Sequence, residues 1–293
     1  MSGLPPGPWE LAPGNFHYLA SWLPAFATRP RVALRETGTM GEQLAIGIDI
    51  GGTGTKHALV NLATGELVTE RVKRPTPQPA TPEALSEVVA EAVAGYADQE
   101  IAAVGVGFPA VVSRGCALTA VNIAPQWRYM DVEEVFSKAI DRKVVVINDG
   151  DAAGLAEVRY GAGAGVKGKV VVVTLGTGVG TSLFLDGRLI PNMELGRLQV
   201  RGKPAGERAA NSVRKRRKLS WSAWARDVEL FVRELDIACW PELIIMGGGV
   251  SKDAHAWLPY ITCRPAITPA RFRNDAGIVG SALYAAEHTD RTR

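Results

Sequence analysis

Asp49-Ile-Gly-Gly-Thr-Gly-Thr-Lys56 joins two short apolar runs, residues 45–50 and 57–60. Both runs are typical of β-strands, so the segment predicts a strand, a glycine turn and a second strand. Glycine lets a backbone approach a ligand closely, and the successive N–H groups of such a turn can bind an anion. The alternative is a hairpin turn that needs glycine only for its geometry. The spacing matches neither GxxxxGK[ST] nor GxGxxG.

A second glycine-rich turn, Thr174-Leu-Gly-Thr-Gly-Val-Gly-Thr181, lies between the apolar runs 170–174 and 181–185. Threonines alternate with its glycines, which repeats the chemistry of the first turn, so we expect a second anion-binding loop between two strands. Taken alone this segment is weak evidence, because glycine-rich β-turns are common. The chain thus has a strand followed by a glycine turn near residue 45 and again near residue 170, and with the alternating strands and helices this repeat indicates an α/β fold.

Asn148 and Asp149 follow the apolar run 143–147 and precede the helical run 152–158. This places a carboxylate at the carboxyl end of a strand, where the sites of α/β proteins gather. Asp149 is therefore a candidate catalytic residue. The alternative is a purely structural role, since Asn148, Asp149 or Asp151 could each cap the helix.

Met246-Gly-Gly-Gly-Val-Ser251 forms another junction between a predicted strand and a helix. Its bare backbone could pack against a flat base, and its N–H groups could bind a phosphate. A tight turn without a ligand is the alternative.

Arg214-Lys-Arg-Arg-Lys218 is a run of five basic residues directly before a predicted helix. Such a run usually forms a solvated face. The functional alternative is a stripe that binds a polyanion, either a long phosphate chain or a nucleic acid.

The remaining sequence alternates predicted strands and helices. Apolar or β-rich runs predict strands at 67–72, 101–107, 143–147 and 243–246. Capping residues and helical spacing predict helices after Thr81 (with an apolar face that reaches Tyr96), after Asp131 and after Ser220, a helix from the turn 247–249 to about Leu258, and a last helix at 276–287. We expect a flexible extension at 1–43, a small lobe at 44–147, a large lobe at 148–275, and a C-terminal helix at 276–288 that packs back on the small lobe.

The composition argues against several classes of protein. The 33 Lys and Arg residues exceed the 30 acidic residues by only three, which is too little to indicate a nucleic-acid-binding protein. Three cysteines and four scattered histidines suggest neither disulfides nor a zinc cluster. There is no transmembrane stretch, and the apolar segment 16–28 lacks the basic flank of a signal peptide. We therefore expect a cytoplasmic protein; whether translation starts at Met1 or Met40 stays open.

In their order and spacing, the two glycine loops, Asn148-Asp149 and Gly247-Gly-Gly-Val-Ser251 resemble the phosphate, catalytic and adenosine segments of the actin-like sugar kinases. Glu194-Leu-Gly196, Asn122 followed by Trp127, and Leu219-Ser-Trp-Ser-Ala-Trp224 further resemble the ROK (repressor, open reading frame, kinase) family. Within that family the chain is most similar to the polyphosphate glucokinases and glucomannokinases of actinobacteria. The match runs from about residue 44 to 287.

The resemblance implies a two-lobed, ribonuclease H-like kinase fold with its active site in the cleft between the lobes. It also implies transfer of a phosphoryl group from polyphosphate or ATP to the 6-hydroxyl of glucose. In this reaction Asp149 would be the general base, and Asp49 would hold Mg²⁺ through water. The sugar would be bound by Asn122, Asn148, Glu194 and Arg197. The phosphates or nucleotide would be bound by Asp49, Gly51, Gly52, Thr53, Gly54, Thr55, Lys56, Gly176, Thr177, Gly178, Gly248 and Gly249. A homodimer is implied, and nucleic acid and membrane partners are not.

The chain departs from the family pattern in three places. The cysteine cluster that binds zinc in many ROK kinases is missing, as it is in the polyphosphate branch. His57 stands where a small residue is usual, and Arg197 replaces the histidine of Glu-x-Gly-His. An arginine is always charged and only donates hydrogen bonds. Arg197 leaves open a weaker affinity for sugar, a changed acceptor such as an anionic one, or lost activity. The alternatives to a glucokinase are an ATP-preferring kinase of another hexose such as mannose, and a sugar- or phosphate-binding protein with weakened catalysis.

Overall fold

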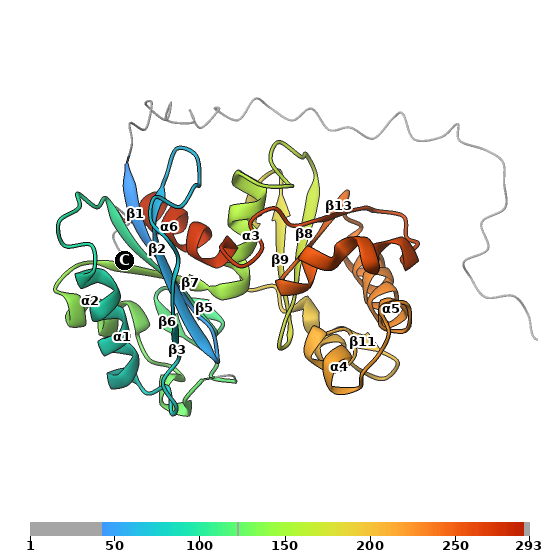
Figure 1. The fold of residues 1–293 in the computed structure, drawn as a ribbon, viewed down its shortest axis with the longest axis horizontal. Coiled ribbons are helices and arrows are strands. Elements are labelled where there is room, and N and C mark those ends of the chain that lie inside the picture. Colours follow the sequence, from blue (N-terminus) through green and yellow to red (C-terminus); the bar gives the residue numbers. More distant parts are fainter. Residues whose placement is uncertain (1–42, 122, 290–293) are drawn as a thin grey trace, which may run out of the picture. The chain divides into compact units, whose positions relative to one another are not determined.

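The computed structural model describes residues 43–121 and 123–289, which form two five-stranded sheets (Figure 1). The first sheet has the order β3-β2-β1-β4-β7 and consists of β1 (Leu44–Ile50), β2 (Gly54–Asn61), β3 (Val72–Pro75), β4 (Ala103–Phe108) and β7 (Val144–Asn148). The second has the order β10-β9-β8-β13-β14 and consists of β8 (Lys169–Leu175), β9 (Val179–Leu185), β10 (Arg188–Ile190), β13 (Leu243–Gly247) and β14 (Ala266–Pro269).

The two sheets repeat one arrangement. In each, the first two strands form an antiparallel hairpin, β1–β2 and β8–β9, and later strands join the first of them in parallel. Both glycine loops are the turns of these hairpins. The expected α/β fold with a pattern that begins twice is therefore confirmed. Two short ladders, β5–β6 (Val112–Ser113 and Cys116–Ala117) and β11–β12 (Gln199–Val200 and Lys203–Pro204), complete the strands of the described residues.

The main helices are α1 (Pro82–Ala94), α2 (Val132–Ile140), α3 (Asp149–Arg159), α4 (Asn211–Arg216), α5 (Trp221–Cys239) and α6 (Ala276–His288). Helices α1, α2 and α5 begin where the capping residues predict, whereas α4 is a helix that the sequence analysis does not predict. The side chains of Thr81, Asp131 and Ser220 accept hydrogen bonds from the backbone N–H three residues on, at 3.3, 2.8 and 3.2 Å. In the part of the chain that the structure describes, no helix has the length and apolar character to cross a membrane.

Successive side chains of a strand point to opposite faces of the sheet, and their sizes decide which helix covers each face. Ile46, Ile48 and Ile50 of β1 are buried with α1 and α2, while the small residues Ala45 and Gly47 face α6. The second sheet is covered by α5 on one face and by α3 on the other. Figure 1 shows α3 and α6 side by side between the two sheets.

Three glycines bring α6 into contact with its neighbours. A Cβ atom at Gly47 or Gly105, which pair across β1 and β4, would lie 1.9 Å from the carbonyl oxygen of Ile278 or Ser281. A Cβ at Gly280 would lie 1.7 Å from the carbonyl oxygen of Ala152 on α3. Side chains larger than hydrogen are therefore excluded, and the backbone of α6 packs directly on the first sheet and on α3.

Three details of the sequence prediction are wrong. Residues 67–71 form only an isolated bridge, between Val60 and Leu67. The hydroxyl of Thr69 takes the place of a backbone partner, because it accepts from the N–H of Leu59 at 3.1 Å. Strand β3 therefore begins at Val72. Helix α1 ends at Ala94, so Tyr96 lies beyond it.

The expected helix after the turn 247–249 is instead a 3₁₀-helix, η4 (Gly249–Ala256), with a kink at Asp253. The hydroxyl of Ser251 donates to the carbonyl oxygen of Gly248 at 2.8 Å, and the indole of the buried Trp257 donates to that of Val250 at 3.2 Å. These side chains occupy two carbonyl oxygens at the start of the segment, which would otherwise accept the first backbone hydrogen bonds of an α-helix. Residues 1–42 of the predicted extension at 1–43, and the predicted sugar ligand Asn122, lie outside the described residues.

Candidate active site

Asp149 is the first residue of α3 and follows β7 directly. The helix is capped by Asn148, whose Oδ1 accepts from the N–H of Asp151 at 3.0 Å and whose Nδ2 donates to the carbonyl oxygen of Ala110 at 2.9 Å. The carboxyl of Asp149 accepts only from the next N–H, that of Gly150, at 2.9 Å among the contacts of the described residues. Since Asn148 provides the cap, the purely structural alternative for Asp149 loses its basis.

The surroundings of Asp149 change its acidity. Burial raises the pKa of its carboxyl to about 7, and the nearby carboxylates of Asp49, Glu194 and Asp151 also raise it. The hydrogen bond from the N–H of Gly150 lowers the pKa, but by less. A group with such a pKa can accept a proton at neutral pH and release it again. Such a perturbed carboxyl at the end of a strand is typical of a catalytic position.

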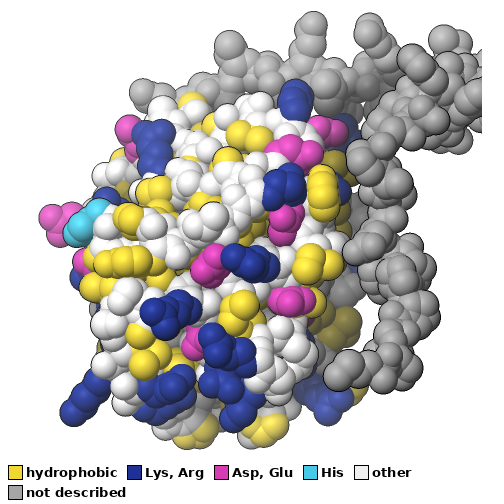
Figure 2. All heavy atoms as spheres, turned by 90° about the vertical axis from the view of Figure 1, so that its right-hand side faces the viewer, with side chains coloured by type: hydrophobic (Ala, Val, Ile, Leu, Met, Phe, Trp, Pro, Cys, Tyr) yellow, Lys and Arg dark blue, Asp and Glu magenta, His cyan; other side chains and the backbone are white. Residues whose placement is uncertain are grey.

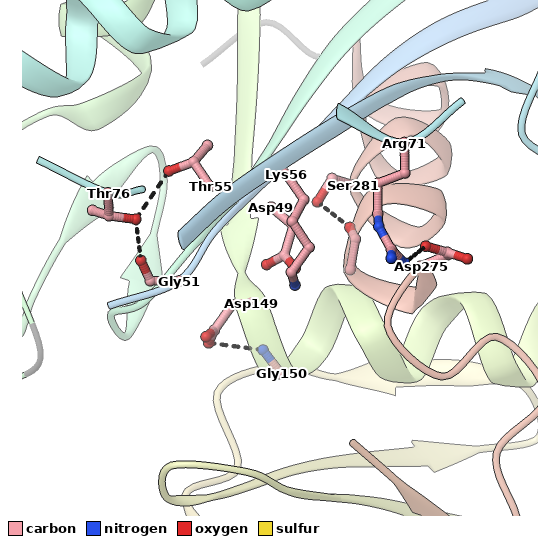
Figure 3. A network of polar contacts seen from close by, with 11 residues as sticks. Asp49, Gly51, Thr55, Lys56, Arg71, Thr76, Asp149, Gly150, Asp275 and Ser281 are labelled. Atoms are coloured by element: carbon pink, nitrogen blue, oxygen red, sulfur yellow. Dashed lines mark hydrogen bonds and ion pairs between the residues drawn. The ribbon is translucent and has the colours of Figure 1, made fainter. Parts of the chain in front are cut away.

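Asp49 and Lys56 face each other across the β1–β2 hairpin, and Lys56 Nζ lies 2.6 Å from Asp49 Oδ2. A Cβ at Gly277, in the first turn of α6, would come within 3.0 Å of the carboxyl of Asp49, so the absence of a side chain there makes room for it. Figure 3 shows both side chains extending from the hairpin toward Asp149. The structure thus brings the first glycine loop to the candidate base.

The first glycine loop is held by residues that the sequence analysis missed. The hydroxyl of Thr76 donates to the carbonyl oxygen of Gly51 at 2.6 Å, and Gln78 Nε2 donates to that of Gly52 at 3.0 Å. The hydroxyl of Thr76 also lies 3.1 Å from that of Thr55 (Figure 3). The N–H of Thr76 donates to the carbonyl oxygen of Thr53 at 3.4 Å. These bonds hold three carbonyl oxygens, which would repel an anion, on the side of β3.

The second glycine loop is closed by a bond from the N–H of Gly176 to the carbonyl oxygen of Gly178, at 3.0 Å. Ser212 of α4 donates its N–H to the carbonyl oxygen of Gly176 at 3.0 Å and its hydroxyl to that of Thr177 at 2.6 Å. A Cβ at Gly176 or Gly178 would meet nothing within 4 Å among the described residues. These glycines are therefore not needed for packing, and the loop has open space for a ligand.

Glu194 precedes the short 3₁₀-helix η2 (Leu195–Arg197). The hydroxyl of Thr181 in β9 fixes this segment, because it donates to the carbonyl oxygen of Met193 at 2.6 Å and accepts from the N–H of Leu195 at 2.9 Å. Arg197 lies 3.8 Å from Glu194 and its side chain is 68% exposed. The carboxylate of Glu194 raises the pKa of both Asp149 and Asp151, so it lies near them, whereas the exposed Arg197 contacts only Glu194 in this group.

Gly248 adopts φ +81°, and a Cβ there would lie 2.7 Å from the backbone of Leu175. Only glycine fits this position. The turn of Gly248 and Gly249 therefore lies against the end of β8, where the second glycine loop begins.

Asp151 and Asn192 form a link for which the sequence offers little signal. Burial raises the pKa of Asp151 to about 7, with Glu194 adding to the effect, although its Oδ2 accepts from the N–H of Asn192 at 2.7 Å. The side chain of Asn192 binds both the N–H and the carbonyl oxygen of Val112, at 3.0 and 2.8 Å. The segment that carries Glu194 is thereby tied to α3 and to β5.

The carboxylates suit a hydrated cation better than a direct metal cage. Within residues 43–121 and 123–289, no three His, Cys, Asp or Glu side chains are grouped so that they could hold a metal together. Mg²⁺ usually keeps several waters and binds through one or two carboxylates plus phosphate oxygens. Asp49, beside the first glycine loop, fits that mode of binding.

Comparison with known proteins places the chain in a family. The model of the ROK family matches residues 45–197. The polyphosphate glucokinase of Mycobacterium tuberculosis is 41% identical over 253 residues, which cover 86% of this chain and 95% of that protein. The chain belongs to the ROK family. This ROK chain is also similar to the crystal structure of the inorganic polyphosphate/ATP-glucomannokinase of Arthrobacter sp. strain KM, with a TM-score of 0.80, 45% identity, and coverage of 84% of this chain and 99% of that one.

A more distant structure agrees in fold. The ROK family glucokinase of Streptomyces griseus, solved with glucose and AMPPNP, has a TM-score of 0.72 at 24% identity and covers 83% of this chain and 99% of that one. The ROK protein described here therefore has the two-lobed actin-like fold that its sequence predicts.

Proposed function

We propose that this ROK protein transfers the terminal phosphoryl group of polyphosphate or ATP to the 6-hydroxyl of glucose and forms glucose 6-phosphate. The observation that carries the proposal is the position of the buried Asp149 carboxyl at the end of β7, facing the hairpin loop that holds Asp49 and Lys56; burial raises its pKa to about 7 (Figure 3). Support comes from relatives that are named polyphosphate glucokinase and polyphosphate/ATP-glucomannokinase and that align over most of the chain.

Phosphoryl transfer needs positioning and charge stabilisation more than covalent help from the protein. Asp149 accepts the proton of the attacking hydroxyl. Glu194 and Asn148 orient the sugar together with Asn122; the amide of Asn148 keeps one N–H and one lone pair beyond its two bonds within the protein. The donor phosphates bind the N–H groups of the two glycine loops, and Lys56 supplies positive charge.

Asp49 would hold Mg²⁺ through water, and the ion would supply further neutralisation of the donor phosphates. We place the boundary between the lobes at residues 147 and 148, with α6 returning to the first lobe, so that Asp49 and Asp149 flank the cleft. A homodimer in the cytoplasm remains a prediction.

The proposal is tested with purified protein, Mg²⁺, glucose and either donor, by coupling glucose 6-phosphate to a dehydrogenase. We expect product from polyphosphate, and from ATP as well. Mannose serves as the competing acceptor, because the Arthrobacter relative is named a glucomannokinase. If neither donor yields glucose 6-phosphate while an authentic glucokinase is active beside it, the proposal fails.

The rate should depend on pH through Asp149. The base must be ionised, so kcat/KM for glucose should rise with pH, reach half its maximum near the pKa of about 7, and level off above it. The rate is measured at saturating Mg²⁺ across this range. A rate that is constant from about pH 5.5 to 8.5 would contradict the assignment of Asp149 as the base.

Arg197→His restores the histidine that the family pattern has at this position, and so tests whether residue 197 affects sugar binding. The arginine is more than half exposed and pairs only loosely with Glu194. A histidine can both donate and accept a hydrogen bond, so we expect the KM for glucose to fall by about tenfold, or about 1.4 kcal/mol. Arg201→His, at another exposed arginine, is the control. An unchanged KM in Arg197→His would show that residue 197 does not contact the acceptor.

A further inference from the structure

The segment around α4 carries an uncompensated positive charge. From Arg208 to Arg226 the sequence has seven Lys and Arg residues and no Asp or Glu. The basic segment, residues 214–218, forms no ion pair with any residue that the structure describes, although ten ion pairs compensate cations elsewhere. Lys215, Arg216, Arg217 and Lys218 are exposed. Figure 2 shows Lys and Arg side chains gathered on the lower part of this face, the level at which α4 lies in Figure 1.

The basic segment starts at the second glycine loop. Ser212, in the first turn of α4, binds the carbonyl oxygens of Gly176 and Thr177 through its N–H and its hydroxyl, at 3.0 and 2.6 Å. Helix α4 ends at Arg216, so the chain advances about 6 Å along the helix axis from Ser212 to that residue. Successive side chains of a helix point about 100° apart, so the cations surround the end of α4 that lies away from the loop, where a ligand longer than a nucleoside triphosphate could reach them.

Arg214 is fixed in position before any ligand binds. Its guanidinium stacks on the ring of Trp221 at 3.7 Å, and its Nε donates to Asn211 Oδ1 at 3.0 Å. The two Nη groups carry four further N–H donors in a plane, a geometry that matches two oxygens of a phosphate. A stacked arginine loses less side-chain entropy when it binds such a group.

We propose that the basic segment binds the distal phosphates of a polyphosphate chain whose reacting end lies at the glycine loops. The inference rests on the proposed function and adds to it a site that serves only the longer donor. The direct connection of α4 to the second glycine loop favours polyphosphate over a nucleic acid, since the same linear anion can occupy the loop and the segment. With its phosphates at the loops and its base at the turn of Gly248 and Gly249, ATP would not need the segment.

The test compares two double variants that each remove two exposed positive charges. Arg216→Gln with Arg217→Gln alters the segment. Lys167→Gln with Arg188→Gln is the matched control, at the end of the β8–β9 hairpin opposite the glycine loop. In the first variant we expect the KM for long-chain polyphosphate to rise about fivefold or more and to depend less on salt. The KM for ATP, the KM for tripolyphosphate and all kcat values should stay within about twofold of the wild type. The control should change none of them.

Equal effects on polyphosphate and ATP, or equal effects of the two variants, would overturn the inference. Binding is measured in parallel by calorimetry with long-chain polyphosphate and with single-stranded DNA of similar charge. If DNA binding weakens as much as polyphosphate binding, the segment is a general polyanion surface and the proposal is wrong. If the wild type binds polyphosphate through the segment but forms no product from it, the proposed phosphoryl donor is wrong and the binding site is supported. If the wild type does not bind polyphosphate, the binding site is wrong.

Discussion

Replacing Asp149 by Asn is expected to lower kcat by about a thousandfold, because the amide cannot accept the proton of the attacking hydroxyl. The cap of α3 is provided by Asn148, so the helix should stay intact. KM values should change little if Asp149 acts mainly on the proton. The exposed Asp98→Asn is the control. A loss of less than about tenfold would show that another group serves as the base.

The same substitution should stabilise the protein above neutral pH. The carboxyl of Asp149 has a pKa raised from 3.8 to about 7, so between these pH values the folded state binds more protons than the unfolded state and stability falls as pH rises. The uncharged amide of the Asp149→Asn variant would remove this contribution, and the raised pKa of Asp151 would leave part of the slope. Tm of the variant should thus exceed that of the wild type at pH 8 and match it near pH 4. A lower Tm at pH 8 would contradict the assigned burial of a charge.

Gly280→Ala is expected to have the largest effect on stability. Its Cβ would lie 1.7 Å from the carbonyl oxygen of Ala152, so α3 and α6 would have to move apart. Overpacking between two backbones costs about 3 kcal/mol or more in the free energy of unfolding, and we expect a large part of the variant to be recovered as insoluble protein.

Gly95→Ala is the matched control for Gly280→Ala. Gly95 has ordinary αR angles, and its Cβ would make only contacts of 3.4 Å or longer. This control should keep or slightly raise the free energy of unfolding, measured in urea, because alanine restricts the unfolded chain. A loss of less than about 1 kcal/mol in Gly280→Ala would mean that the two helices are not packed as described.

Local patterns were sufficient to predict most elements of this fold. The hairpin from Asp49 to Lys56 and the helix caps at Thr81, Asp131 and Ser220 depend on neighbours within a few residues, and the structure confirms them. The strand predicted at 67–72 failed because one threonine hydroxyl replaces a ladder bond, which the apolar pattern does not reveal.

The supports of the candidate site could not be predicted, because they join residues far apart in the sequence. Thr76 holds the turn at Gly51, and Asn192 binds the backbone of Val112. In the sequence, Thr76 is only a threonine between two prolines, and Asn192 follows Pro191 in a stretch for which no element is predicted. In the sequence, Asp151 is a candidate only for the helix cap, because its burial near Glu194 depends on the packing of α3.

The central claim, transfer to a hexose hydroxyl with Asp149 as base, is tested most directly by following the reaction with ³¹P NMR. Purified protein is mixed with Mg²⁺, glucose and long-chain polyphosphate, beside the Asp149→Asn variant. We predict that a phosphomonoester resonance of glucose 6-phosphate grows as the polyphosphate end groups change, and that the variant shows no such growth over the same time. Orthophosphate as the sole product, or equal ester formation by the variant, would contradict the account.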